Sequence, residues 1–324
     1  MVLGPIPRVA RGIPLHREVT MGNSASIMNG MDTAASERRS KRVRLSSMPR
    51  FLVFLSTLFI LVTFGMATAV FVWDGFSVDR LNPGAGLTLA NYRHTLGDPY
   101  NWHVLISTAW ISVLVVIFTA LISYPLALAI ARRRDWWGEV FFAVVLTSST
   151  MSLVIRALGW IGFLDTNGVL NSVLIRTHLI AAPLRVLGTD TAVIIGLVHG
   201  FVPLLTLTLI PVLQNIDPAL EAAAAGLGAQ RWEQLWRITL PLSAPGLING
   251  SFIVFAMSMG AYTTPALLGG GNTLSFPELI QQQVSLLRDF PTGAVLAITL
   301  LIFVLVTTAF AALITRIRFP VIGG

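Results

Sequence analysis

The sequence contains no cysteine and only one lysine among its 324 residues. Without cysteine, the chain has neither a disulfide framework nor a thiolate for metal binding or nucleophilic attack. The one lysine, Lys41, follows a serine rather than a glycine, which excludes a Walker A phosphate-binding sequence. The five histidines form no His-Glu-x-x-His pattern, and no pair of carboxylates lies in an apolar segment. We therefore expect no catalytic residue, no metal site and no cofactor in this chain, which is not expected to be an enzyme.

Charged residues are also scarce, at 11% of the chain against 54% hydrophobic residues. Soluble domains are about one quarter charged. Long apolar segments occur six times, at residues 51–73, 104–131, 140–160, 191–214, 246–268 and 293–315. Each is long enough to cross a hydrocarbon core of about 30 Å as a helix. The sequence therefore predicts an all-α membrane protein with six transmembrane helices in a domain spanning residues 51–318.

The net charge of +7 is unevenly distributed along the chain. Nine of the 22 Lys and Arg residues lie in residues 1–50, which show no sustained hydrophobic period and are predicted to form a disordered tail. With a cytoplasmic N-terminus, 16 of the 22 basic residues fall in cytoplasmic loops and tails, and 5 fall in outer loops. This is the bias of the positive-inside rule. The basic charge is therefore interpreted as a topology signal that places both termini in the cytoplasm, and no nucleic-acid partner is expected.

A polar, alanine-rich loop, residues 215–245, separates the fourth and fifth segments and is cytoplasmic in this topology. Asp217-Pro218 is typical of a helix start, because Asp can cap free N–H groups and proline has none to satisfy. Glu221 follows near the helix start, where the helix dipole favours an anion. Gly226 and Gly228 indicate where this helix ends.

A second helix is predicted in the same loop from an apolar stripe that prolines terminate. The stripe consists of Trp232, Leu235, Trp236 and Thr239, and the prolines are Pro241 and Pro245. Two short helices joined by a glycine elbow, in an otherwise apolar chain, indicate a surface that docks onto another protein.

Two ionisable residues fall in the apolar segments. His199 is a functional candidate by its position, and the alternative is a neutral histidine bonded to a neighbouring helix. Arg156 lies near one end of the third segment, where it either extends to the outer interface or lines a solute path. Trp73, Trp102 and Trp160 lie near segment ends, as in an interfacial aromatic belt.

The fifth segment contains a likely helix break, if its composition is compared with transport proteins, at residues 259–265. Discontinuous helices often mark transport sites, which makes Tyr262, Thr263 and Pro265 candidates for a solute path. The alternative is close helix packing through small residues.

The 215–245 loop resembles the cytoplasmic EAA loop of permease subunits of binding-protein-dependent ABC importers. That pattern reads Glu-Ala-Ala, three residues, Gly, nine residues, Ile-x-Leu-Pro. Counting back from Gly228 places Ala222, Ala223 and Ala224 on the Glu-Ala-Ala positions, so Glu221 lies one residue early. One residue turns a helical side chain by about 100°, so Glu221 need not replace the motif's glutamate. The resemblance implies that an ATPase is coupled through Glu221, Ala222, Ala223, Gly228, Ile238, Leu240 and Pro241.

Other stretches are similar to the spermidine/putrescine branch of this family, namely residues 87–92, 152–160, 167–171, 262–270 and 279–283. The resemblance covers about residues 51–318. It implies the type I ABC importer permease (MetI-like) architecture, with a coupling helix between spans four and five, in a bacterial inner membrane. It also implies a second permease subunit, usually a different chain, two cytoplasmic ATPase subunits that hydrolyse the ATP, and an extracytoplasmic solute-binding protein.

The solute itself remains open between several amines. A polyamine is favoured by the resemblance, but no span contains a carboxylate to meet a polycation and Arg156 has the opposite sign. The alternatives are an amino-acid-like amine, an opine or an aminophosphonate. Two other functions compete: a stand-alone channel or secondary carrier would not need a docking loop, and an intramembrane enzyme built on His199 lacks an acid within the spans.

Overall fold

The computed structural model describes residues 48–78, 86–133 and 135–318. The predicted disordered tail lies outside the described residues up to residue 47, and a helix begins at Met48. Every regular element in this described part is helical, and an isolated β-bridge joins Ser77 and Leu87. The predicted all-α class is confirmed.

The chain separates into two compact units, Met1–Thr68 and Ala69–Gly324. The described part of the first unit is the beginning of α2 (Met48–Phe76), whose side chains from Val53 onward are almost all exposed and apolar. Such a helix suits contact with lipid. The second unit contains the end of α2 and the other helices, and the remaining description concerns this unit.

The helices of the second unit follow one another with short connections. After α2 they are α3 (Ala90–Gly97), α4 (Pro99–Arg132), α5 (Trp136–Thr150), α6 (Leu153–Leu164), α7 (Val169–Arg176), α8 (Asp190–Gln214), α9 (Pro218–Gly226), α10 (Arg231–Gln234), a π-helix (Leu235–Thr239), α11 (Leu240–Met259), α12 (Thr263–Leu268), α13 (Phe276–Gln281), a second π-helix (Gln282–Leu286) and α14 (Phe290–Arg318). Among the described residues, six helical segments are long and apolar enough to cross a membrane, which confirms the predicted number.

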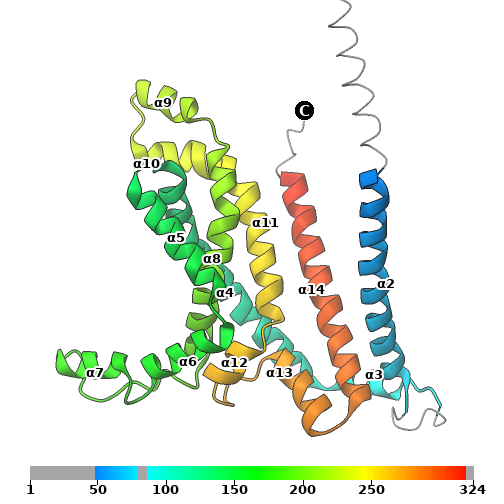
Figure 1. Cartoon of the computed structure of the whole chain (residues 1–324). Helices are drawn as coiled ribbons and strands as arrows, with labels where there is room; N and C mark the ends of the chain where they lie inside the picture. Colours follow the sequence, from blue (N-terminus) through cyan, green and yellow to red (C-terminus); the bar gives the residue numbers. More distant parts are fainter. Residues whose placement is uncertain (1–47, 79–85, 134, 319–324) are drawn as a thin grey trace, which may run out of the picture. The chain divides into compact units, whose positions relative to one another are not determined.

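The third apolar segment differs from the prediction of one span at residues 140–160. The structure divides it into α5 and α6 at Met151 and Ser152, both in extended conformations. Near this break the Ser149 hydroxyl donates to the carbonyl of Leu146, a local bond that competes with the helix ladder. The 15 residues of α5 reach only about 22 Å. The helices α6 and α7 run across the end of the bundle instead of continuing α5 (Figure 1).

The centre of the second unit is the packing of α4, α8 and α11 on one another. Glycines permit the close approach of α11 to α8, because a Cβ at Gly246 would lie 2.7 Å from a methyl of Val212, and one at Gly250 would lie 2.5 Å from Leu205. The Ser123 hydroxyl on α4 donates to the carbonyl of Val202 on α8, at 3.1 Å. Small residues therefore set this three-helix contact, as is common between membrane helices.

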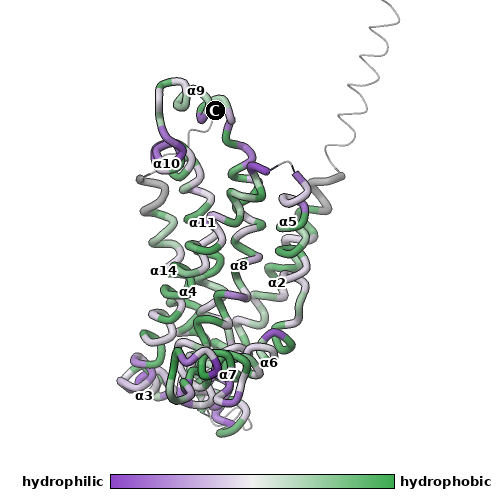
Figure 2. Tube along the Cα trace, turned by 90° about the vertical axis from the view of Figure 1, so that its left-hand side faces the viewer, coloured by the Kyte–Doolittle hydropathy of each residue, from purple (hydrophilic) through white to green (hydrophobic). Residues whose placement is uncertain are grey.

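The 215–245 loop and the end of α14 lie at the same end of the second unit, and α3, α7, α12 and α13 lie at the opposite end (Figure 1). Within this unit, Figure 2 shows hydrophilic residues gathered around α9 and α10 and again around α3 and α7, with apolar residues along the helices between them. The arrangement matches a membrane domain with one polar surface on each side.

Candidate functional site

The first helix of the 215–245 loop begins and ends where the sequence predicts. The Asp217 carboxylate accepts a hydrogen bond from the backbone N–H of Ala219 at 2.9 Å, which caps α9. At its other end, the N–H of Gly228 donates to Ala225 and the N–H of Ala229 donates to Ala224, each at 3.0 Å. These two bonds form a Schellman turn, in which Gly228 adopts the left-handed conformation with a φ of +88°. The glycine elbow is therefore a defined turn.

The second helical piece differs from the prediction, because Pro241 and Pro245 do not end it. The chain continues from α10 through the π-helix into α11 without interruption. Pro241 lies in the first turn of α11, a position at which proline is tolerated because its missing N–H breaks few bonds. Pro245 lies deeper, where neighbouring helices and hydroxyl side chains compensate for a freed carbonyl in membrane helices.

The predicted apolar stripe on this second piece is split between two environments. Trp232 and Trp236 are exposed and pack edge to face, with ring centroids 5.4 Å apart. Thr239 is only 2% exposed. The π-helix explains the split, since the wider turn shifts Thr239 relative to the tryptophans and directs it into the protein.

The residues implied for coupling do not share one surface. Ala222, Ala223, Gly228 and Pro241 are exposed, whereas Ile238 and Leu240 are partly buried. Glu221 is half-buried and faces the bundle, where its carboxylate meets Arg132 at the end of α4. The exposed surface of α9 and its elbow is therefore formed by small and apolar residues, including Leu227, which is 90% exposed.

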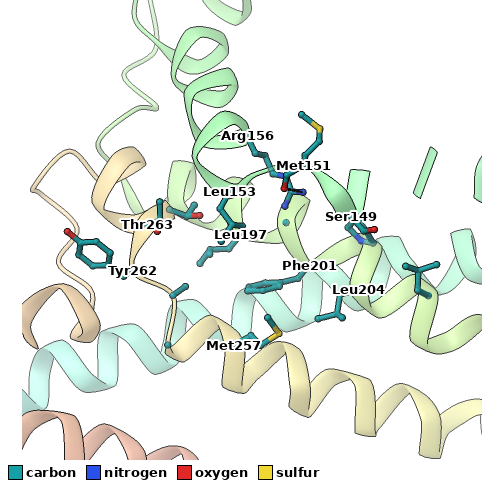
Figure 3. Close-up of a pocket in the computed structure, with 16 residues that line it drawn as sticks. Ser149, Met151, Leu153, Arg156, Leu197, Phe201, Leu204, Met257, Tyr262 and Thr263 are labelled. Carbon is teal, nitrogen blue, oxygen red and sulfur yellow. Dashed lines mark hydrogen bonds between the residues drawn. The ribbon is translucent and has the colours of Figure 1, made fainter. Parts of the chain in front are cut away.

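A cavity of about 680 Å³ lies where two helices are interrupted. One wall is formed by the break between α5 and α6, the second by residues 260–264 around the break between α11 and α12, and the third by α8. Figure 3 shows Phe201 in the middle of this space, between Arg156 and Met257. The predicted helix break in residues 259–265 is present, because residues 261 and 262 are not helical.

Arg156 belongs to this cavity and does not extend to the outer interface. Its side chain is buried, with 7% of the residue exposed, and its Nη2 donates to the carbonyl of Ser148 at 2.6 Å. The guanidinium therefore caps the C-terminal end of α5, where the helix dipole favours a cation. Its Nε has no hydrogen-bond partner among the described residues. A Cβ at Gly200 would lie 3.1 Å from Nη1, so this glycine leaves room for the arginine.

The other candidates for a solute path are divided between the cavity and the packed interior. Tyr262 and Thr263 line the cavity. Pro265 is buried within α12 and does not line it. The apolar lining residues Phe201 and Met257 were not among the predicted candidates, because apolar residues in a membrane helix carry no distinguishing signal in the sequence.

His199 is bonded to a neighbouring helix. The indole N–H of Trp160 on α6 donates to Nδ1 of His199 on α8 at 3.0 Å. An accepting ring nitrogen carries no proton, so the imidazole is neutral. Trp160 is partly buried and joins α6 to α8, so its predicted place in an interfacial belt is wrong.

The comparisons with known proteins agree with this geometry. Residues 123–319 match the family described as the binding-protein-dependent transport system inner membrane component. The spermidine/putrescine transport system permease protein PotB of Haemophilus influenzae is 34% identical over 66% of this chain and 74% of the relative. The corresponding Escherichia coli protein is 32% identical over 66% of this chain and 78% of the relative.

A solved structure shows the same fold. It is a bacterial alginate ABC transporter in complex with an alginate pentasaccharide-bound periplasmic protein. The TM-score is 0.70 at 18% identity, over 85% of this chain and 96% of the other. With the six membrane-spanning segments and the 215–245 loop, these matches show that the chain belongs to the family of binding-protein-dependent transport system inner membrane components, and is a multi-pass permease of an ABC importer.

Proposed function

We propose that this permease carries a polyamine such as spermidine or putrescine from an extracytoplasmic binding protein into the cytoplasm. The observation that carries the proposal is the similarity to two permeases named for spermidine and putrescine transport. The cavity supports a cationic solute in a limited way. It contains no carboxylate among its described lining residues, but Phe201 and Tyr262 present aromatic rings that can bind ammonium groups through cation–π contacts.

The partners follow from two exposed surfaces. The exposed Leu227 and Trp232 at the 215–245 loop suit a groove on an ATPase subunit, since a helix docked in a groove is a recurring mode of recognition. Met151, Leu153 and Met257 are exposed where they line the cavity. A second permease subunit, a different chain in this proposal, closes that apolar side. The complete importer then contains two permeases, two ATPases that hydrolyse ATP and a solute-binding protein.

The topology places the 215–245 loop and both termini in the cytoplasm. Because the chain lacks cysteine, single cysteines can report this directly. Leu227→Cys, in a residue 90% exposed, is expected to react with a membrane-impermeant maleimide in inverted vesicles and not in spheroplasts. Leu179→Cys, which is 71% exposed and follows α7 at the other end of the unit, is expected to react in spheroplasts. The reverse labelling pattern would contradict the topology.

The transport proposal is tested by uptake of labelled spermidine into proteoliposomes that contain the whole importer and its binding protein. We expect uptake that requires internal ATP and the binding protein, and that unlabelled putrescine reduces. Uptake of spermidine that is absent, with a zwitterionic amine taken up instead, would contradict the polyamine proposal while leaving the importer architecture intact. Uptake without ATP would instead favour a secondary carrier.

A second candidate is a solute that carries an anionic group beside its amine, such as an amino-acid-like amine, an opine or an aminophosphonate. It is favoured by Arg156, whose unpaired Nε and neighbouring Nη1 lie at the cavity wall. The same uptake assay distinguishes the two. Arg156→Gln removes the charge while retaining an N–H donor for the carbonyls of α5, and Arg156→Lys retains the charge. Loss of uptake in the glutamine variant alone would support the anionic solute, and equal uptake would support the polyamine.

A further inference from the structure

Glu221 is turned away from the exposed surface of α9. Its Oε1 accepts two hydrogen bonds, one from Arg132 Nη2 at 2.5 Å and one from the Thr239 hydroxyl at 2.8 Å. Arg132 is the last residue of α4, and Thr239 is the last residue of the π-helix that leads into α11. A single carboxylate oxygen therefore connects α9 to two of the three central helices.

The hydrogen bonds continue from Glu221 into the bundle. The hydroxyl of Ser243 on α11 donates to the carbonyl of Thr239 at 2.7 Å, and the hydroxyls of Ser243 and Tyr124 lie 2.9 Å apart. Tyr124 belongs to α4, two turns before Arg132. The path therefore starts at Glu221, enters α11 and returns to α4, which places the loop, α4 and α11 in one network.

The π-helix is necessary for this arrangement. Its five residues end at Thr239, which is buried with 2% of the residue exposed. In a regular α-helix the loss of one inserted residue turns the following side chains by about 100°, which would rotate Thr239 relative to Trp232 and Trp236. The inserted residue thus lets the same segment present tryptophans outward and a hydroxyl toward Glu221.

The Arg132–Glu221 pair is partly protected from water. The two side chains are 25% and 24% exposed. Arg132 Nε is buried and has no partner among the described residues, so Glu221 supplies the counter-charge of a cation that is otherwise poorly satisfied. Removal of one member of such a pair leaves an uncompensated charge. The pair is consequently suited to hold two elements in one relative position.

We propose that Glu221 is a positioning residue that fixes α9 to α4 and to the start of α11, so that movement of the docked loop is transmitted to the helices lining the cavity. This proposal rests on the proposed docking of an ATPase to the 215–245 loop. In this role Glu221 does not contact the ATPase; the exposed small and apolar residues of α9 do. The carboxylate instead prevents the loop from moving alone about its glycine elbow.

The test compares Glu221→Gln with Glu139→Gln in the complete importer, because Glu139 is an exposed acid in the first turn of α5. Three quantities are measured: ATPase co-purification, ATP hydrolysis stimulated by the spermidine-loaded binding protein, and spermidine transported per ATP. For Glu221→Gln we expect normal co-purification, continued hydrolysis and a fall of about tenfold in spermidine per ATP, within the range of typical coupling between sites. Glu139→Gln is expected to match the unmodified protein.

The charge exchange Arg132→Glu with Glu221→Arg separates a positioning role from general destabilisation. The exchange is expected to restore a large part of the spermidine transported per ATP, whereas each single change lowers it. An unchanged ratio in Glu221→Gln, or no recovery in the exchanged protein, would overturn the proposal. Loss of ATPase co-purification in Glu221→Gln would also overturn it by making Glu221 a direct docking contact. If the unmodified complex itself neither retains the ATPase nor transports spermidine, the proposed function fails instead.

Discussion

Gly228→Val is expected to abolish solute uptake and to weaken co-purification of the ATPase. Gly228 has a φ of +88°, and a Cβ placed there would meet no atom within 4 Å. The effect therefore arises from the backbone and not from crowding. The left-handed conformation costs an L-residue about 1–2 kcal/mol, and a β-branched residue is a still stronger outlier there. Relief of that strain would open the Schellman turn between α9 and α10 and redirect the docking surface.

A matched comparison is available within the same elbow. A Cβ at Gly226 also meets no atom within 4 Å, but Gly226 is the last residue of α9 and has no positive φ. We expect Gly228→Ala to lower spermidine uptake and Gly226→Ala to affect it much less. Gly228→Asn is expected to retain more uptake than Gly228→Ala, since Asn enters the left-handed region more readily. Full uptake with an intact complex in Gly228→Val would show that the elbow does not position the docking surface.

Gly246→Val is expected to destabilise the membrane domain itself. A Cβ at Gly246 would lie 2.7 and 2.8 Å from the two methyl groups of Val212, and 3.1 Å from its Cβ. Valine has a stiff side chain that cannot easily rotate away. Overpacking of a well-packed core typically costs about 1–3 kcal/mol, and the displaced α11 would also disturb the Thr239–Ser243 part of the network. We expect a lower thermal denaturation midpoint of the detergent-solubilised importer and a lower level of the permease in membranes.

Val212→Ala provides the compensating change for this prediction. It removes the two methyl groups nearest to the new side chain, so the double variant is expected to recover part of the lost thermal stability. Gly162→Val is the control, because Gly162 is an exposed helical glycine at which a Cβ meets no atom within 4 Å. A Gly246→Val protein as stable as the Gly162→Val protein would show that α8 and α11 do not require this close approach.

The number of membrane spans and the ends of α9 were determined by the sequence alone, because both depend on local chemistry. A long apolar run must form a helix in lipid, where each backbone polar group needs an internal partner. Asp217 caps the residues that directly follow it, and the turn at Gly228 involves only the preceding residues of its own helix. Such signals do not depend on the rest of the fold.

The tertiary structure decided the features that depend on distant residues. Arg156 caps α5 across a helix break that an apolar run of residues conceals. Trp160 pairs with His199, 39 positions away, instead of facing lipid. Pro265 is buried beside the cavity whose wall Phe201 and Met257 complete.

Glu221 shows the same division most clearly. The sequence established that it lies one position before the expected glutamate, but the carboxylate can be assigned a direction only with its partners in view. Those partners, Arg132 and Thr239, lie 89 and 18 positions away and are brought to it by α4 and by the π-helix. Local propensity determined that α9 forms, and long-range packing determined which way its one acidic side chain points.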